Sequence, residues 1–202
     1  SLHPRDFTFT ASALLSEGVA LALAGYDLAP HVAMGTILDQ ARLAAITLHR
    51  LVSRPVPVAG HSAGAHLAAA LTATRWRRIA PDLPDDMVPA GLGISGVYDL
   101  APLVSLSVNE VLGLSEKEAL RLSPVRWPVP QGRSFDVFVG GTESSEFLRQ
   151  SRELAAAWRA QGIAAPYCEV AGANHFTVVD ALSDPASSMV GRLVEMARAI
   201  AG

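Results

Sequence analysis

One pentapeptide in the chain has the residue types of a nucleophile site: Gly60, His61, Ser62, Ala63 and Gly64 form a G-x-S-x-G pattern between an apolar run and an alanine-rich segment. A serine hydroxyl becomes a useful nucleophile when a sharp strand-to-helix turn projects it toward a base, and flanking glycines leave room for that turn. The Ala63 N–H, at the start of the helix, would face an oxyanion formed beside the serine. We predict Ser62 as a nucleophile; the alternative is a structural glycine turn with a capping serine.

A nucleophilic serine needs a general base, and six histidines compete for that role. His175 lies in the sequence GANHF, a loop that follows the last predicted strand, at the sheet edge where active sites of open α/β folds form. The others have ordinary explanations as a turn residue, helix residues or loop residues near the chain start: His61, His66, His49, His3 and His31. We predict His175 as the base.

A carboxylate must hold the base in one tautomer. The predicted strand at residues 135–139 is followed by the loop GGTESSE, which contains Glu143 and Glu146. We predict Glu143 as the acid, because Glu146 falls in the first turn of the next helix, where the helix dipole ordinarily explains a carboxylate. Asp136, inside the strand, and Asp180, after the base, are expected to be surface or helix-start carboxylates.

Apolar periodicity indicates the elements that must position these residues. Continuous apolar runs are typical of strands covered on both faces, and a spacing of three to four residues is typical of helices. The predicted strands are residues 19–25, 56–59, 90–95, 135–139 and 165–170, and the predicted helices are residues 34–51, 66–74, 145–161 and 187–201. This alternation predicts an α/β fold with a mostly parallel sheet and helices on both faces.

Residues 100–130 interrupt this alternation with several prolines and one short helical stretch near residues 115–122. We expect an insertion there that covers part of the site. The length of 202 residues fits a single domain over residues 1–202, and a hydrophobic content of 50% supports a sizeable core and excludes a disordered chain.

Charge and composition narrow the expected partners and compartment. Sixteen Lys and Arg against 19 Asp and Glu give a net charge of −3, so the chain has no basic face for nucleic acid. The apolar run at residues 18–26 is too short to cross a bilayer, and the uncharged stretch at residues 55–74 is interrupted by Pro and Gly, so no membrane partner is expected. The single cysteine, Cys168, allows no internal disulfide or cysteine-rich metal site, and the expected compartment is the cytoplasm.

Several segments within residues 25–176 together resemble the kynurenine formamidase (arylformamidase) family of α/β-hydrolases. They are GYDLAP, GHSAGAHL, SGVYDLAPL, NEVLGLSEKEALRLSP, GGTESSEFLRQS and GANHF. The resemblance implies hydrolysis of a small molecule, N-formyl-L-kynurenine, to L-kynurenine and formate in tryptophan degradation, without a metal or organic cofactor. It implies Ser62 as nucleophile, Glu143 as acid and His175 as base. Asp27, within GYDLAP, is expected to be a hydrogen-bonded structural carboxylate.

Two features depart from the family pattern. The family's usual acid is Asp, where this chain has Glu143. The family also carries an HGG-type loop after an early strand, whose N–H groups complete the oxyanion hole, and this sequence contains no HGG. Either N-terminal strands are missing from this chain, or the oxyanion hole depends on the Ala63 N–H alone. We expect the former, with the gene continuing upstream through a strand and such a loop.

The sequence leaves substrate recognition and two other functions open. Tyr98, Asn109 and Phe176 are the predicted substrate-binding residues, and each has an alternative role in packing or capping. The same triad would serve a carboxylesterase acting on small acyl esters, whereas a catalytically inactive hydrolase-fold binding protein is the third hypothesis. Exposed apolar surface on so hydrophobic a chain would favour a homodimer.

Overall fold

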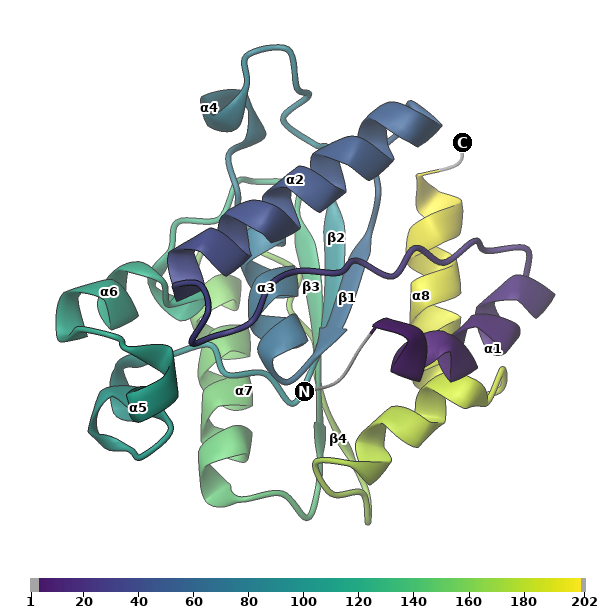
Figure 1. Ribbon diagram of the computed structural model, residues 1–202. Coiled ribbons are helices and arrows are strands. Elements are labelled where there is room, and N and C mark those ends of the chain that lie inside the picture. Colours follow the sequence, from purple (N-terminus) through teal and green to yellow (C-terminus); the bar gives the residue numbers. More distant parts are fainter. Residues whose placement is uncertain (1–3, 201–202) are drawn as a thin grey trace.

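Four short parallel strands form the centre of the protein in the computed structural model, which describes residues 4–200. They are β1 (Val58–His61), β2 (Ala90–Ile94), β3 (Ser134–Gly140) and β4 (Tyr167–Val170), and they lie side by side in that order (Figure 1). Neighbouring parallel strands need a crossover connection, which helical segments provide here. The predicted α/β class with a parallel sheet is confirmed.

The long helices lie close to the ranges that the apolar spacing predicts. They are α2 (Met34–Val52), α3 (Ala63–Thr72), α7 (Ser145–Arg159) and α8 (Ser188–Ala199). Short helical elements that this spacing does not predict are η1 (Pro4–Thr10), α1 (Ala11–Ser16), α4 (Trp76–Ile79) and η4 (Thr177–Ser183), because one or two turns contain too few periodic positions. Within residues 4–200, no helix is long and apolar enough to cross a membrane.

Helices cover both faces of the sheet (Figure 1). On one face α3 and α7 pack against β3, where Ala65, Phe135 and Trp158 are buried together. On the other face η4 and α8 bury Leu92 with Met189. β2 is buried along its whole length, as expected for a parallel strand between two helical layers.

Asp136 differs from its predicted role as a surface carboxylate. Its side chain points to the α8 face of β3 and is only 3% exposed, and both of its oxygens accept hydrogen bonds from Arg192, at 2.6 and 3.2 Å. A buried carboxylate requires such a charged partner, because its desolvation is otherwise costly. This ion pair joins α8 to β3, so Asp136 has a structural role.

Residues 100–130 contain only short helical elements: η2 (Ala101–Ser105), α5 (Asn109–Leu112), α6 (Glu116–Arg121) and η3 (Pro124–Arg126). α6 lies within the predicted helical stretch and begins with a reciprocal capping box between Ser115 and Glu118. The interruption of the β/α alternation is therefore as predicted. Its covering of the site remains a prediction.

The prediction of a strand at residues 19–25 is wrong. This run is extended and crosses in front of β1 on its way from α1 to α2 (Figure 1), but it has no ladder partner within residues 4–200. Leu21 and Leu23 are 36% and 38% exposed rather than buried. An apolar run becomes a strand only when a neighbour takes up its backbone hydrogen bonds, and β1 is paired only with β2 in the described structure.

Candidate active site

Ser62 lies at the tip of a sharp turn between β1 and α3. Its backbone has φ +55° and ψ −117°, a conformation that L residues rarely adopt, and its N–H donates to the Ile94 carbonyl at 2.9 Å. Strained backbone of this kind persists only where the surroundings hold it, and it is the geometry by which a turn presents a serine hydroxyl. The strand–turn–helix arrangement predicted for the pentapeptide is confirmed.

The glycine before the turn is required by close packing. A Cβ on Gly60 would lie 2.1 Å from the Gly64 carbonyl oxygen, which belongs to the first turn of α3. No side chain fits at that distance, so glycine allows β1 and α3 to meet directly behind Ser62. Ala63, the first residue of α3, is exposed beside the serine, and first-turn N–H groups have no partner within a helix.

The three predicted residues come together in one hydrogen-bonded chain. The Nε2 of His175 lies 3.1 Å from the Ser62 Oγ, and its Nδ1 lies 2.8 Å from the Glu143 Oε2. The Glu143 side chain is completely buried, whereas that of His175 is 22% exposed. Since a carboxylate can only accept, Nδ1 donates to Glu143 and Nε2 is left to accept the serine proton.

The loops that hold the acid and the base are tied to each other. Thr142 donates to the Ala173 carbonyl through its N–H at 3.0 Å and through its hydroxyl at 2.8 Å. In the base loop, the Asn174 side chain accepts from the N–H groups of Phe176 and Thr177, at 2.9 and 3.0 Å. These bonds fix the histidine loop against the end of β3.

Two rings and one long-range hydrogen bond hold His175. The ring of Phe147 lies 4.3 Å from the His175 ring, and the ring of His61 lies 4.6 Å from it, between centroids. The Nε2 of His61 also lies 2.8 Å from the His175 carbonyl oxygen, to which it donates. Burial lowers the pKa of His61, and the nearby charge of a protonated His175 lowers that pKa further, so His61 is favoured as a neutral donor.

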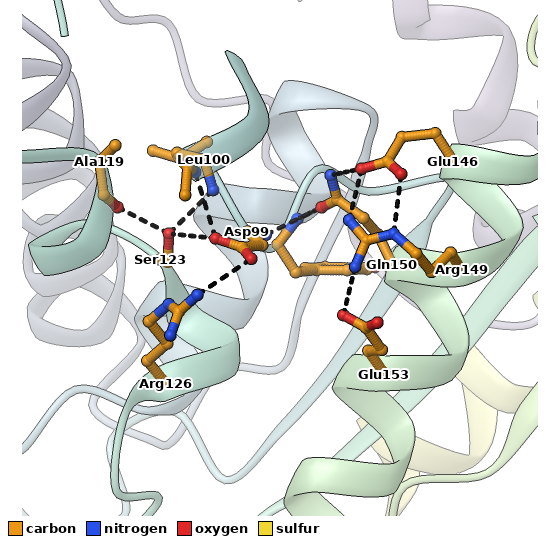
Figure 2. Close-up of polar contacts among 11 residues, drawn as sticks. Asp99, Leu100, Ala119, Ser123, Arg126, Glu146, Arg149, Gln150 and Glu153 are labelled. Atoms are coloured by element: carbon orange, nitrogen blue, oxygen red, sulfur yellow. Dashed lines mark hydrogen bonds and ion pairs between the residues drawn. The ribbon is translucent and has the colours of Figure 1, made fainter. Parts of the chain in front are cut away.

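Glu146, the alternative acid, has other partners. It accepts hydrogen bonds from Arg149 and Gln150 within α7, and the bond from Arg149 lowers the pKa of its carboxyl. Figure 2 shows the network to which it belongs: buried Gln150 accepts from the N–H groups of Tyr98 and Asp99 at 2.7 and 2.8 Å. Glu146 therefore helps to join α7 to the segment after β2, and Glu143 contacts the base.

The predicted substrate-binding residues lie in three different settings. Tyr98 is completely buried, with its ring against the edge of Phe135. Asn109 binds backbone groups of its own loop, donating to the carbonyls of Val104 and Leu114. Phe176 is 79% exposed beside His175. Tyr98 and Asn109 thus make packing and loop contacts, while the ring of Phe176 is exposed to solvent beside the base.

The remaining histidines and Asp27 have structural contacts. His66 is buried in α3 and donates from Nε2 to the Leu122 carbonyl at 2.8 Å, and His49 bonds the Arg54 carbonyl at 2.7 Å. Asp27 and Gln40 exchange two hydrogen bonds, in agreement with a structural carboxylate. His31 is exposed at the turn before α2, where its N–H bonds the Leu28 carbonyl, and His3 lies outside the described residues.

Ser95 and Phe147 are contacts of the triad that the sequence does not mark. Ser95 follows the end of β2 and donates from its hydroxyl to Glu143. Its place at the end of a predicted strand and before Gly96 is the one available signal. Within residues 4–200, no group of three or more His, Cys, Asp or Glu side chains is arranged to hold a metal ion.

Comparison with known proteins identifies relatives along nearly the whole chain. The chain is 33% identical over 195 residues to kynurenine formamidase of Danio rerio, and 32% identical over 206 residues to that of Salmo salar. These matches include 93% and 96% of this chain, and 66% and 68% of the two relatives, so the chain spans about two thirds of their length. No family model matches.

Solved structures agree on the fold. A crystal structure from Silicibacter sp., of a protein assigned as a thioesterase, matches 95% of this chain and 70% of its own with a TM-score of 0.85 and 30% identity. An esterase of Pyrobaculum calidifontis matches 93% of this chain and 70% of its own with a TM-score of 0.74, at 16% identity. On sequence and architecture together, the chain belongs to the kynurenine formamidase family and has the α/β-hydrolase fold.

Proposed function

We propose that this chain carries the catalytic residues of a serine hydrolase that cleaves the formamide of N-formyl-L-kynurenine to L-kynurenine and formate. The observation that supports this most is the hydrogen-bonded order Ser62, His175 and Glu143, with the serine at a strained turn and the acid buried. The membership of the kynurenine formamidase family supports the choice of substrate.

In the proposed acylation step the Ser62 Oγ attacks the formyl carbon while the His175 Nε2 accepts the serine proton. Glu143, bonded to Nδ1, orients the imidazole and stabilises its positive charge. The Ala63 N–H donates to the developing oxyanion. His175 then gives the proton to the nitrogen of the leaving arylamine, the C–N bond breaks, and a formyl ester remains on Ser62.

The proposed deacylation step repeats this chemistry with water. His175 takes a proton from a water molecule, whose oxygen attacks the formyl ester, and the proton returns to the Ser62 oxygen as formate leaves. Only side chains of the triad and backbone N–H groups take part. The exposed ring of Phe176, which lies 5.5 Å from the His175 ring between centroids, is a proposed contact for the aromatic part of the substrate.

Labelling with a fluorophosphonate probe tests the nucleophile, and hydrolysis of N-formyl-L-kynurenine tests the substrate. We expect labelling of the parent chain, loss of labelling in Ser62→Ala, and normal labelling in Ser107→Ala, which removes an exposed serine hydroxyl from another part of the surface. Failure of the parent chain to react would support the inactive hydrolase-fold binding protein instead.

A carboxylesterase acting on small acyl esters is the second candidate. It is favoured by the likeness in fold to several esterases and by a triad that serves esters and formamides alike. The ratio of kcat/KM for N-formyl-L-kynurenine to that for p-nitrophenyl acetate distinguishes the two. A ratio well above one supports the formamidase, and hydrolysis of the ester alone supports the esterase.

A further inference from the structure

Ser95 occupies a position between the nucleophile turn and the acid loop. It directly follows β2, whose last residue, Ile94, accepts a hydrogen bond from the Ser62 N–H through its carbonyl. The N–H of Ser95 donates to the Phe138 carbonyl of β3 at 2.8 Å. Ser95 is completely buried. Its backbone is therefore fixed to the ends of the strands that carry the serine and the acid.

The Ser95 hydroxyl bonds the side of the acid that faces away from the base. It donates to the Glu143 Oε1, which also accepts the Gly140 N–H at 2.8 Å, while the Oε2 of the same carboxylate faces His175. Rotation about the last bond of a glutamate side chain is soft, so the chain alone does not fix the plane of the carboxylate. Two donors on Oε1 restrict that rotation and keep Oε2 on His175.

The backbone conformation of Ser95 indicates that its hydroxyl has a specific role. Its φ is +52°, in the left-handed region where glycine is favoured and other residues carry strain. Glycine would remove this strain and would keep the backbone bond to Phe138, but it would lose the hydrogen bond to Glu143. A buried serine in this conformation is therefore better explained by its side chain than by its backbone.

The surrounding network prevents the two loops from moving apart. Gln150 of α7 accepts from the N–H groups of Tyr98 and Asp99, three and four residues after Ser95 (Figure 2). α7 begins two residues after Glu143, so this contact fixes the segment after β2 relative to the helix that follows the acid. The distance between Ser95 and Glu143 is thus set by rigid elements on both sides.

We propose that Ser95 is a positioning residue that orients the Glu143 carboxylate toward His175. The inference rests on the proposed function, in which Glu143 orients the base. It also accounts for how a glutamate serves in this loop, since its longer side chain has one more rotatable bond than aspartate and needs an additional restraint.

The first test measures the rate at which a fluorophosphonate labels Ser62. Hydrogen bonds to charged groups correspond to about a tenfold to hundredfold effect, so we expect Ser95→Ala and Ser95→Gly to slow labelling by about that factor. Ser123→Ala is the matched control, because Ser123 is equally buried and its hydroxyl bonds the Ala119 carbonyl, the Asp99 side chain and the Leu100 N–H, but no residue of the triad. In a Glu143→Gln background, Ser95→Ala should slow labelling no further. Additive losses, or equal slowing by Ser123→Ala, would overturn the proposal.

The second test does not depend on reactivity. A proton shared by a histidine Nδ1 and a carboxylate gives a ¹H NMR signal far downfield, and we expect this signal of His175 to shift or broaden in Ser95→Gly but not in Ser123→Ala. If the fluorophosphonate fails to label the parent chain, but the NMR signal is present and shifts in Ser95→Gly, the proposed hydrolase is contradicted. The role of Ser95 in orienting Glu143 is then still supported. A labelled parent chain with no shift and no slowing in Ser95→Gly would contradict the role of Ser95 alone.

Discussion

Two apolar stretches of similar length have opposite outcomes in this molecule. Residues 90–94 form β2, which pairs with β3 along its whole length and with β1 from Gly91 onward, and which is buried on both faces. Residues 19–25 are as apolar in sequence, yet they run extended without a ladder partner in the described structure, and their leucines are partly exposed. The contrast teaches that an apolar run indicates a strand only together with neighbours that take up its hydrogen bonds.

The same contrast extends to the chemistry of the molecule. The paired strands β1, β2 and β3 end at one edge of the sheet, where they bring Ser62, Ser95 and Glu143 together. Two residues after the unpaired stretch, Asp27 bonds Gln40 of α2 instead. Register between strands, rather than burial alone, determines which side chains meet.

The largest expected effect is at the paired edge. Ser62→Ala and His175→Ala should each lower kcat by about 10⁶-fold, and the double variant should be little worse, because the two residues act as one unit. Steady-state kinetics on the hydrolysed substrate measure this. Melting temperatures within a few degrees of the parent are needed as a control, and multiplied losses in the double variant would contradict a shared role.

A smaller loss is expected at the acid. Glu143→Gln should lower kcat by about 10⁴-fold, because the imidazole then loses the partner that fixes its tautomer. Glu146→Gln should leave kcat close to that of the parent and cost only about 0.3 to 1 kcal/mol of stability, as for a carboxylate in a first helical turn. The two variants are compared by kinetics and by urea unfolding. The reverse ranking would transfer the role of the acid to Glu146.

Stability should separate the two apolar stretches directly. Leu92→Ala, in the centre of β2, removes a completely buried side chain and should lower the free energy of unfolding by about 2 to 5 kcal/mol. Leu21→Ala makes the same chemical change in the unpaired stretch, where it should alter the free energy by less than about 0.5 kcal/mol. Equal losses in urea unfolding would show that the stretch at residues 19–25 is paired in solution.

The smallest expected effect is on the pH dependence of stability. Burial lowers the pKa of His66 in the folded protein, so the unfolded chain binds a proton more readily. The contribution of neutral His66 to the free energy of unfolding is therefore complete above the pKa of histidine in the unfolded chain, about 6.5, and is lost as the pH falls below that pKa. His66→Gln, which keeps a donor for the Leu122 carbonyl, should reduce the fall in melting temperature between pH 7.5 and 5. An unchanged fall would contradict this assignment.

Much of the fold and of the candidate site follows from local sequence. Periodicity predicts the four long helices, and the two central strands lie within a residue of their predicted bounds. Ser62, Glu143 and His175 are predictable because each follows a strand, and parallel strands bring such residues to one edge. The first paired strand begins two residues later than predicted, because Val56 bonds Met87 outside the sheet.

The remaining features depend on contacts between distant segments. Ser95 lies 48 residues from Glu143, and His61 bonds a carbonyl 114 residues away, so no local pattern marks either contact. The burial of Asp136 depends on Arg192 of α8, which the local pattern around the strand does not include. Residues 19–25 show the opposite case, in which the local pattern is present and the partner is not in the described structure.

The two glycines of the pentapeptide are not equivalent, and this affects how divergent members of such a family can be found. A Cβ at position 60 would collide with backbone at 2.1 Å, whereas a Cβ at position 64 would meet no atom within 4 Å. A residue with a Cβ is thus sterically allowed at position 64 and excluded at position 60. A search that demands glycine at both places would discard chains with alanine at the second, although their nucleophile turn could form as it does here.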